Sequence, residues 1–212
     1  MAGRKALAIN LSDLAAMGAE PTAFLIALGI SSSMKKSWIL RFYKGMMDLA
    51  KQYNVKCVGG DITRAKEFFV SITLIGQAKQ EEIIRRAGAR NGDWIAVTGN
   101  LGGSILKHHY SFEPRIKEAR FLTTQFRPTS MIDISDGFLQ DLEHILKASG
   151  VSAEIHLDKI PVSQDARNLE SALTGGEDFE LLFTMPQNTK SALEKVWAKK
   201  FPKVQLSWVG KI

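Results

Sequence analysis

The chain has 212 residues, of which 45% are apolar and 24% charged, and it carries a formal net charge of +6. This composition suits one full domain or two small ones around a buried core, and it excludes fibrous and largely disordered classes. The longest apolar stretch, residues 23–30, is far shorter than the roughly 20 residues that span a bilayer, so we expect no membrane helix. Because the N-terminal residues also lack the apolar core of a secretory signal, we expect a cytoplasmic protein.

The apolar periodicity of the first 78 residues is typical of alternating helices and strands. It predicts helices at 5–17 and 37–53 and strands at 22–30, 55–58 and 68–75. A charged stretch, residues 77–92, is expected to be a linker to a second unit. There the pattern predicts strands at 94–98, 131–134, 151–157, 181–184 and 204–209, and helices at 114–126, 137–149 and 188–200. Because helices and strands are interleaved irregularly, we expect an α+β (mixed α/β) fold with two domains, residues 1–78 and 79–212.

The first predicted helix carries a carboxylate within an almost wholly apolar sequence. Nine of the twelve residues from Ala6 to Met17 are apolar, so the helix is expected to be buried nearly all round. An unpaired buried carboxylate is strongly unfavourable. Asp13 therefore either takes part in an ion or metal site, or it faces a wet groove or caps a neighbouring helix.

A second carboxylate follows two glycines. In Gly59-Gly60-Asp61 a predicted strand ends in residues that let a phosphate approach backbone N–H groups closely. The pattern is compatible with a nucleotide or metal-phosphate turn and equally with a plain turn.

The second unit contains two further acidic motifs. Asp133 stands between isoleucines in a predicted strand, which implies burial on at least one face. Asp136 stands at the mouth of a helix, where it could be a simple N-cap. Residues 175–178, Gly-Gly-Glu-Asp, repeat the glycine and acid pattern ahead of the next strand.

Four acidic motifs at element ends in one chain indicate binding of a hard cation. Oxygen donors without cysteine or histidine favour Mg²⁺, usually together with substrate phosphates. Arg85 and Arg86 could supply the cationic side of a phosphate site, or they could lie in a solvated helical turn. The sequence has no Walker loop and no G-x-G-x-x-G motif, so an ATP site would be built differently. We interpret the pair His108-His109 as a solvated helix end.

Five stretches strengthen this interpretation because they occur together and in a fixed order. They are residues 5–21 (KALAINLSDLAAMGAEP), 59–63 (GGDIT), 86–99 (RAGARNGDWIAVTG), 133–137 (DISDG) and 174–178 (TGGED). The set resembles the thiamine-monophosphate kinase family. The wider superfamily of aminoimidazole ribonucleotide synthetase, selenophosphate synthetase and the hydrogenase maturation factor shares only a looser version of it.

The resemblance implies ATP-dependent, Mg²⁺-dependent phosphorylation of thiamine monophosphate to thiamine diphosphate. It also implies an aminoimidazole ribonucleotide synthetase-like fold of two domains, a homodimer formed by the N-terminal halves, and nucleotide bound between the domains. By the family's pattern the carboxylates that hold Mg²⁺ are Asp13, Asp61, Asp133 and Asp136. The residues that contact ATP are Gly60, Asp61, Arg86 and Ser135, and Glu177 meets the thiamine moiety. The resemblance implies no acid or base catalyst.

The chain departs from the family's pattern at both ends. The family carries a further glycine-rich, acidic N-terminal segment and an aromatic C-terminal substrate contact, so we expect a truncated N-terminal half and weak or no kinase activity. The alternatives are a superfamily member with a different acceptor and a nonenzymatic nucleotide-binding or dimerisation module. A nucleic-acid partner is not expected, because the basic excess is confined to residues 1–78 and no basic, aromatic-studded stretch occurs.

Overall fold

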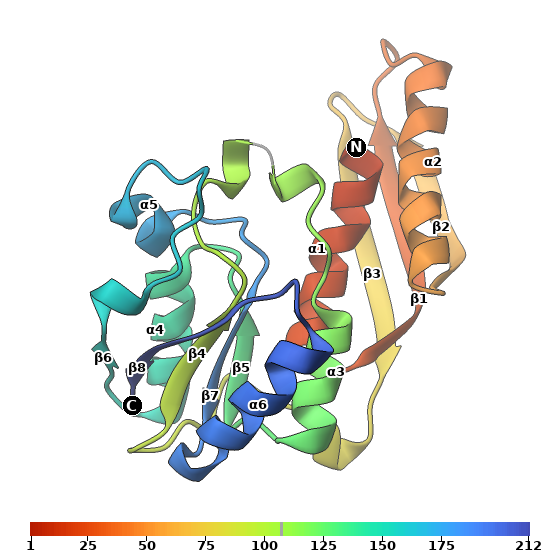
Figure 1. The fold of residues 1–212 in the computed structure, drawn as a ribbon. Helices are drawn as coiled ribbons and strands as arrows, with labels where there is room; N and C mark the ends of the chain where they lie inside the picture. Colours follow the sequence, from red (N-terminus) through yellow and green to blue (C-terminus); the bar gives the residue numbers. More distant parts are fainter. Residues whose placement is uncertain (107) are drawn as a thin grey trace.

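The computed structural model describes residues 1–106 and 108–212 and has a mixed α/β fold with two separate sheets (Figure 1). The α-helices are α1 (Ala2–Ala16), α2 (Lys36–Gln52), α3 (Ile116–Gln125), α4 (Phe138–Ser149), α5 (Leu169–Thr174) and α6 (Lys190–Lys200). The strands are β1 (Glu20–Ile30), β2 (Lys56–Arg64), β3 (Phe69–Gln77), β4 (Trp94–Thr98), β5 (Ser130–Asp133), β6 (Glu154–Ile155), β7 (Leu181–Met185) and β8 (Leu206–Lys211). The expected fold class is confirmed. Within the two described stretches, no helix is long and apolar enough to cross a membrane.

The N-terminal sheet has the strand order β2-β1-β3, with β1 parallel to β2 and antiparallel to β3. Its inner face packs against α1 and α2 through the buried side chains of Phe24, Ile26 and Leu28. Alternate side chains of a strand point to the opposite face, and Leu25 and Ile75 there are 39% and 48% exposed. We call this the outer face; it consists of Ala23, Leu25, Ala27, Phe69, Ser71, Thr73 and Ile75.

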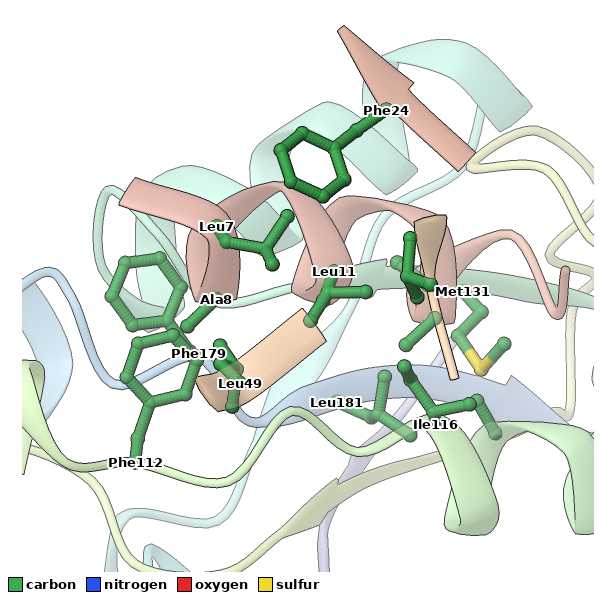
Figure 2. Close-up of a cluster of buried hydrophobic side chains, with 14 of the residues drawn as sticks. Leu7, Ala8, Leu11, Phe24, Leu49, Phe112, Ile116, Met131, Phe179 and Leu181 are labelled. Atoms are coloured by element: carbon green, nitrogen blue, oxygen red, sulfur yellow. The ribbon is translucent and has the colours of Figure 1, made fainter. Parts of the chain in front are cut away.

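Helix α1 is buried on two sides, with eight of its 15 residues buried, but Asp13 is exposed, so the burial predicted nearly all round holds only in part. It packs against α2 and β3 on one side and against α3 and β5 on the other (Figure 1). Figure 2 shows Leu7 and Leu11 of α1 in one cluster with Phe24 from the first sheet and Leu181 from the second. The helix therefore joins the two sheets through a common apolar core. The domain boundary near residue 78 stays a prediction.

The C-terminal sheet has the strand order β5-β7-β4-β8-β6, and all its pairings are antiparallel. Both faces are covered by helices. Ala96 and Phe183 pack in the core that contains α1, α3 and α6, whereas Ile95 and Leu182 pack with α4 and α5. Burial on both faces explains why β7 reads as a nearly continuous apolar run.

Residues 59–61 differ from the prediction. They continue strand β2 instead of forming a turn. The backbone of Gly60 approaches β1 so closely that a Cβ would lie 1.9 Å from the carbonyl oxygen of Ile26. The glycine is therefore required by the close approach of two paired strands, β1 and β2, at this position.

Two elements of the second unit also differ. The strand expected at 151–157 is reduced to Glu154–Ile155 at the edge of the sheet. The short helix α5 has no counterpart among the predicted elements. It begins with a capping box, in which Asn168 and Ser171 satisfy each other's backbone N–H groups.

Gly3 allows α1 to cross α2 closely, because a Cβ there would lie 1.8 Å from the carbonyl oxygen of Phe42. Gly3→Ala is expected to lower the free energy of unfolding by about 1–3 kcal/mol, although alanine is normally the better helix residue. Gly45→Ala is the matched control on α2, since its Cβ would have its nearest neighbour at an ordinary 3.5 Å. Urea unfolding should show the control to be neutral or stabilised. Equal effects of the two variants would contradict the close crossing.

Candidate functional site

A cleft of about 560 Å³ lies between the C-terminal turns of α1, residues 84–87 and the turn from β5 into α4. It is lined by four carboxylates, two arginines, a serine and a histidine among other residues. These polar lining residues are Asp13, Arg85, Arg86, Asp133, Ser135, Asp136, Asp141 and His144. The cleft thus brings together five of the predicted site residues: Asp13, Arg86, Asp133, Ser135 and Asp136.

Asp133 ends strand β5 and is only 5% exposed. Its Oδ2 accepts a hydrogen bond of 2.6 Å from Ser12 Oγ of α1. Burial raises the pKa of Asp133 to about 7; the carboxylates of Asp13 and Asp141 contribute to the rise, and the Ser12 hydrogen bond opposes it. The burial predicted from the flanking isoleucines is confirmed. A carboxylate with so high a pKa favours a bound proton or a nearby cation.

Asp141 holds the turn between β5 and α4. Its Oδ2 accepts hydrogen bonds from the backbone N–H groups of Ser135, at 2.9 Å, and Asp136, at 3.0 Å. Burial is the largest cause of a raised pKa at Asp141. The N-cap position of α4 is Gly137, and it has no side-chain cap. The alternative that Asp136 is a simple N-cap of this helix is therefore wrong.

The donor set of the cleft fits a hard divalent cation. Asp133 is buried and Asp136 is exposed. Asp13 is exposed as a whole residue, but partial shielding of its carboxyl group from water raises its pKa. Among the described residues, the group whose ligand atoms all lie within 4.8 Å of one another is Asp136, Asp141 and His144. It contains an imidazole, which the sequence did not predict, and it shares only Asp136 with the predicted ligand set. Carboxylates gathered in this way repel one another, and Mg²⁺ with its preference for oxygen ligands would relieve that repulsion.

The arginines enter the cleft from an extended segment. The carbonyl oxygen of Arg85 accepts a hydrogen bond of 3.0 Å from the N–H of Met131, so the segment runs beside β5. Arg85 and Arg86 lie outside any helix, and the alternative of a solvated helical turn is wrong. Two guanidinium groups beside a carboxylate cluster suit bidentate contacts with phosphate.

Gly60 and Asp61 lie elsewhere, on the edge strand β2. Both are exposed, Asp61 is paired in register with Ala27 of the outer face, and neither residue lines the cleft. The single chain therefore does not bring Asp61 into the cleft with Asp13. The roles of Gly60 and Asp61 stay predictions.

Glu177 lines a second, mostly apolar cavity of about 310 Å³. Ile105, Leu106 and three glycines also line it, together with the polar residues Asp165, Arg167 and Ser171. The carboxylate of Glu177 contacts Lys5 and His109, two residues that sequence reasoning missed. His109 is buried in the 3₁₀ turn η3 (His108–Tyr110), so its interpretation as a solvated helix end is wrong.

Comparisons with known proteins show the family of the chain. The model of the AIR synthase related protein N-terminal domain matches residues 1–78, and that of the C-terminal domain matches residues 96–205. The thiamine-monophosphate kinase of Rhodopirellula baltica is 38% identical over 99% of this chain and 68% of its own length. The chain belongs to the thiamine-monophosphate kinase family. The family predicted from the sequence motifs is thereby confirmed.

Solved structures of this kinase family share the fold. The thiamine-monophosphate kinase from Stenotrophomonas maltophilia K279a has a TM-score of 0.87 at 32% identity, covering 99% of this chain and 74% of that one. The structure of AaThiL complexed with AMPPCP and TMP has a TM-score of 0.85 at 28% identity, covering 99% of this chain and 72% of that one. The chain spans about two thirds of the length of the curated kinases that it matches.

Asp133→Asn tests the buried carboxylate. The pKa of about 7 in the folded protein lies above the ordinary 3.8, so without cations stability is lost as the pH rises from about 4 to 7. The variant lacks this titration and can still accept a hydrogen bond from Ser12. Urea unfolding in EDTA should show Asp133→Asn more stable than wild type above about pH 7, with the difference vanishing below about pH 4. The control is Asp48→Asn at an exposed site, and a pH-independent gain at Asp133 would contradict the raised pKa.

Proposed function

We propose that this chain carries the phosphoryl-transfer site of an enzyme that moves the γ-phosphoryl group of ATP to the phosphate of thiamine monophosphate, yielding thiamine diphosphate. The observation that carries the proposal is the cleft in which Asp13, Asp133 and Asp136 lie with Arg85 and Arg86. Carboxylates for cations and arginines for phosphates are the parts that phosphoryl transfer needs. The relatives named thiamine-monophosphate kinase, and the relative complexed with AMPPCP and TMP, support the substrates.

The cleft carboxylates Asp13, Asp133 and Asp136 would hold Mg²⁺. Asp61 and Gly60 lie outside this cleft in the single chain, so a role for Asp61 in holding Mg²⁺ and for Gly60 in contacting ATP rests on the resemblance alone. When bound, Mg²⁺ neutralises and aligns the phosphates. The carboxylate oxygens of Asp13, Asp133 and Asp136 are ligands of the kind that Mg²⁺ prefers.

The transfer needs no general base on this chain. A phosphate monoester has a second pKa near 6, so the accepting oxygen is largely deprotonated at neutral pH. The obstacle is repulsion between two anions, which Arg86 lowers by pairing with phosphate oxygens while Ser135 contacts the nucleotide. Ser12 keeps the Asp133 carboxylate in one orientation through its hydrogen bond of 2.6 Å.

The thiamine moiety is proposed to bind at Glu177. A flat heterocycle needs apolar walls and one well-placed polar group. Ile105 and Leu106 offer such walls in the cavity of about 310 Å³. The carboxylate of Glu177 offers an acceptor for the amino group of the pyrimidine ring.

A second copy of the chain is proposed to cover the outer face of the N-terminal sheet. Leu25, Phe69 and Ile75 are exposed there, and β2 is an edge strand. A contiguous apolar face on a sheet marks an interaction surface. A homodimer through this face also agrees with the resemblance stated from the sequence.

The activity is tested by incubating the protein with ATP, Mg²⁺ and thiamine monophosphate and measuring thiamine diphosphate. The sequence predicts weak or no activity for this chain, and with the cleft carboxylates and arginines brought together we expect product to form slowly. Asp13→Asn and Asp136→Asn should lower the rate by about 10²- to 10³-fold, because each removes a carboxylate proposed to hold the Mg²⁺ that neutralises the transferring group. Asp48→Asn is the control and should leave the rate unchanged. Binding of ATP without any product would favour the nonenzymatic module and sink the proposed activity.

The dimer is tested by placing a charge on the outer face. Leu25→Glu is expected to shift the protein from dimer to monomer in light scattering, because a carboxylate cannot be buried there without a partner. Leu40→Glu on α2, at an exposed apolar position away from that face, should leave the dimer intact. A monomeric wild-type protein would contradict the proposed dimer.

A further inference from the structure

Two side chains from distant segments hold the carboxylate of Glu177. Lys5 Nζ, on α1, lies 2.6 Å from Glu177 Oε1, and His109 Nδ1, in η3, lies 2.9 Å from Glu177 Oε2. Lys5 Nζ and His109 Nδ1 are themselves 2.8 Å apart. A closed triangle of contacts therefore engages both carboxylate oxygens.

The triangle is largely shielded from water. The side chains of Lys5, His109 and Glu177 are 20%, 11% and 34% exposed. The ring of Tyr110 lies 5.5 Å from Lys5 Nζ, and Arg4 donates a hydrogen bond of 3.3 Å to the carbonyl oxygen of Tyr110. Helix α1 therefore holds both the lysine and the turn that carries His109.

His109 Nδ1 can serve only one of its two partners at a time. When Nδ1 carries a hydrogen it donates to Glu177, and when it does not it accepts from Lys5. In both cases Lys5 donates to Glu177. The Lys5–Glu177 ion pair is therefore present in both cases, and Nδ1 is the ring atom through which His109 contacts either partner.

The backbone of Glu177 is held as well. Its φ of +65° lies in the left-handed region, and its N–H donates a hydrogen bond of 2.8 Å to the carbonyl oxygen of Ser135, a residue of the cleft. The next residue, Asp178, is buried and accepts a hydrogen bond of 2.8 Å from the N–H of Gly102. Glu177 thus stands between the cleft and the apolar cavity with backbone and side chain both fixed.

We propose that Lys5 and His109 are positioning residues of the substrate site that fix the orientation of the Glu177 carboxylate; the inference rests on the function proposed above. A free glutamate side chain loses rotamer freedom when it binds a ligand. A carboxylate that is held before the ligand arrives avoids this loss. The positive charge of Lys5 also offsets the negative charge of the Glu177 carboxylate. The site therefore recognises a ligand by the direction in which its N–H group points. The class of substrate that accepts the phosphoryl group is an amino-substituted aromatic heterocycle that carries a phosphate monoester.

The first test is calorimetric binding of thiamine monophosphate. Lys5→Met and His109→Leu should each weaken binding at least about tenfold, as expected when a hydrogen bond to a charged group is removed, and should leave ATP binding unchanged. Lys44→Met removes an exposed lysine that pairs with Asp48 at 2.8 Å and is the matched control. Unchanged affinity for thiamine monophosphate in both site variants would overturn the inference.

A second test separates positioning from general damage to the fold. Asparagine places an amide nitrogen near the position of Nδ1 and glutamine places one near Nε2, so His109→Asn should keep most of the affinity and His109→Gln should lose it. In a Glu177→Gln background, Lys5→Met should have little further effect, because it acts through Glu177. Equal losses in the two His109 variants, or full additivity with Glu177→Gln, would contradict the proposal.

The outcomes also distinguish this inference from the proposed function. A wild-type protein that binds ATP but not thiamine monophosphate overturns both. A wild-type protein that binds both ligands, with Lys5→Met and His109→Leu binding equally well, overturns the inference alone.

Discussion

The site depends on one physical constraint, the burial of the Asp133 carboxylate against helix α1. Ser12 is its hydrogen-bond partner at 2.6 Å, and burial together with Asp13 and Asp141 raises its pKa to about 7. An ionised carboxylate in such a place destabilises the fold until opposite charge arrives. Repulsion among the cleft carboxylates therefore destabilises the fold, and a bound cation would offset it. Such a loss of stability at a functional site is common in proteins.

Local patterns in the sequence predicted the features that depend on neighbours along the chain. The apolar run around Asp13 predicted a helix buried nearly all round, and the isoleucines beside Asp133 predicted its burial. The second prediction holds and the first holds except at the exposed Asp13, because apolar periodicity reports the faces of one element. Asp141 was not predicted, although it lies on one helix face with Phe138 and Leu142 at the spacing of an apolar stripe, which could have indicated a buried carboxylate.

Features set by long-range pairing could not be predicted in this way. Lys5 is separated from His109 by 104 positions and from Glu177 by 172, and nothing near any of the three indicates the others. Gly60 was ambiguous for a different reason. A glycine is required both where a phosphate meets a turn and where two strands approach closely, and only the register between β1 and β2 distinguishes the two.

Helix α1 carries Lys5 near one end and Ser12 and Asp13 near the other. At about 1.5 Å per residue, the step from Lys5 to Ser12 is about 10 Å, two turns along one face. The helix thus fixes the spacing between two parts of the proposed site. Lys5 holds the carboxylate proposed to bind the heterocycle, and Ser12 and Asp13 lie at the carboxylates proposed to bind Mg²⁺ beside the phosphates. Because backbone hydrogen bonds fix the rise per residue of α1, this spacing is set before a ligand binds. An acceptor with a longer or shorter spacer between ring and phosphate would fail to reach both ends at once.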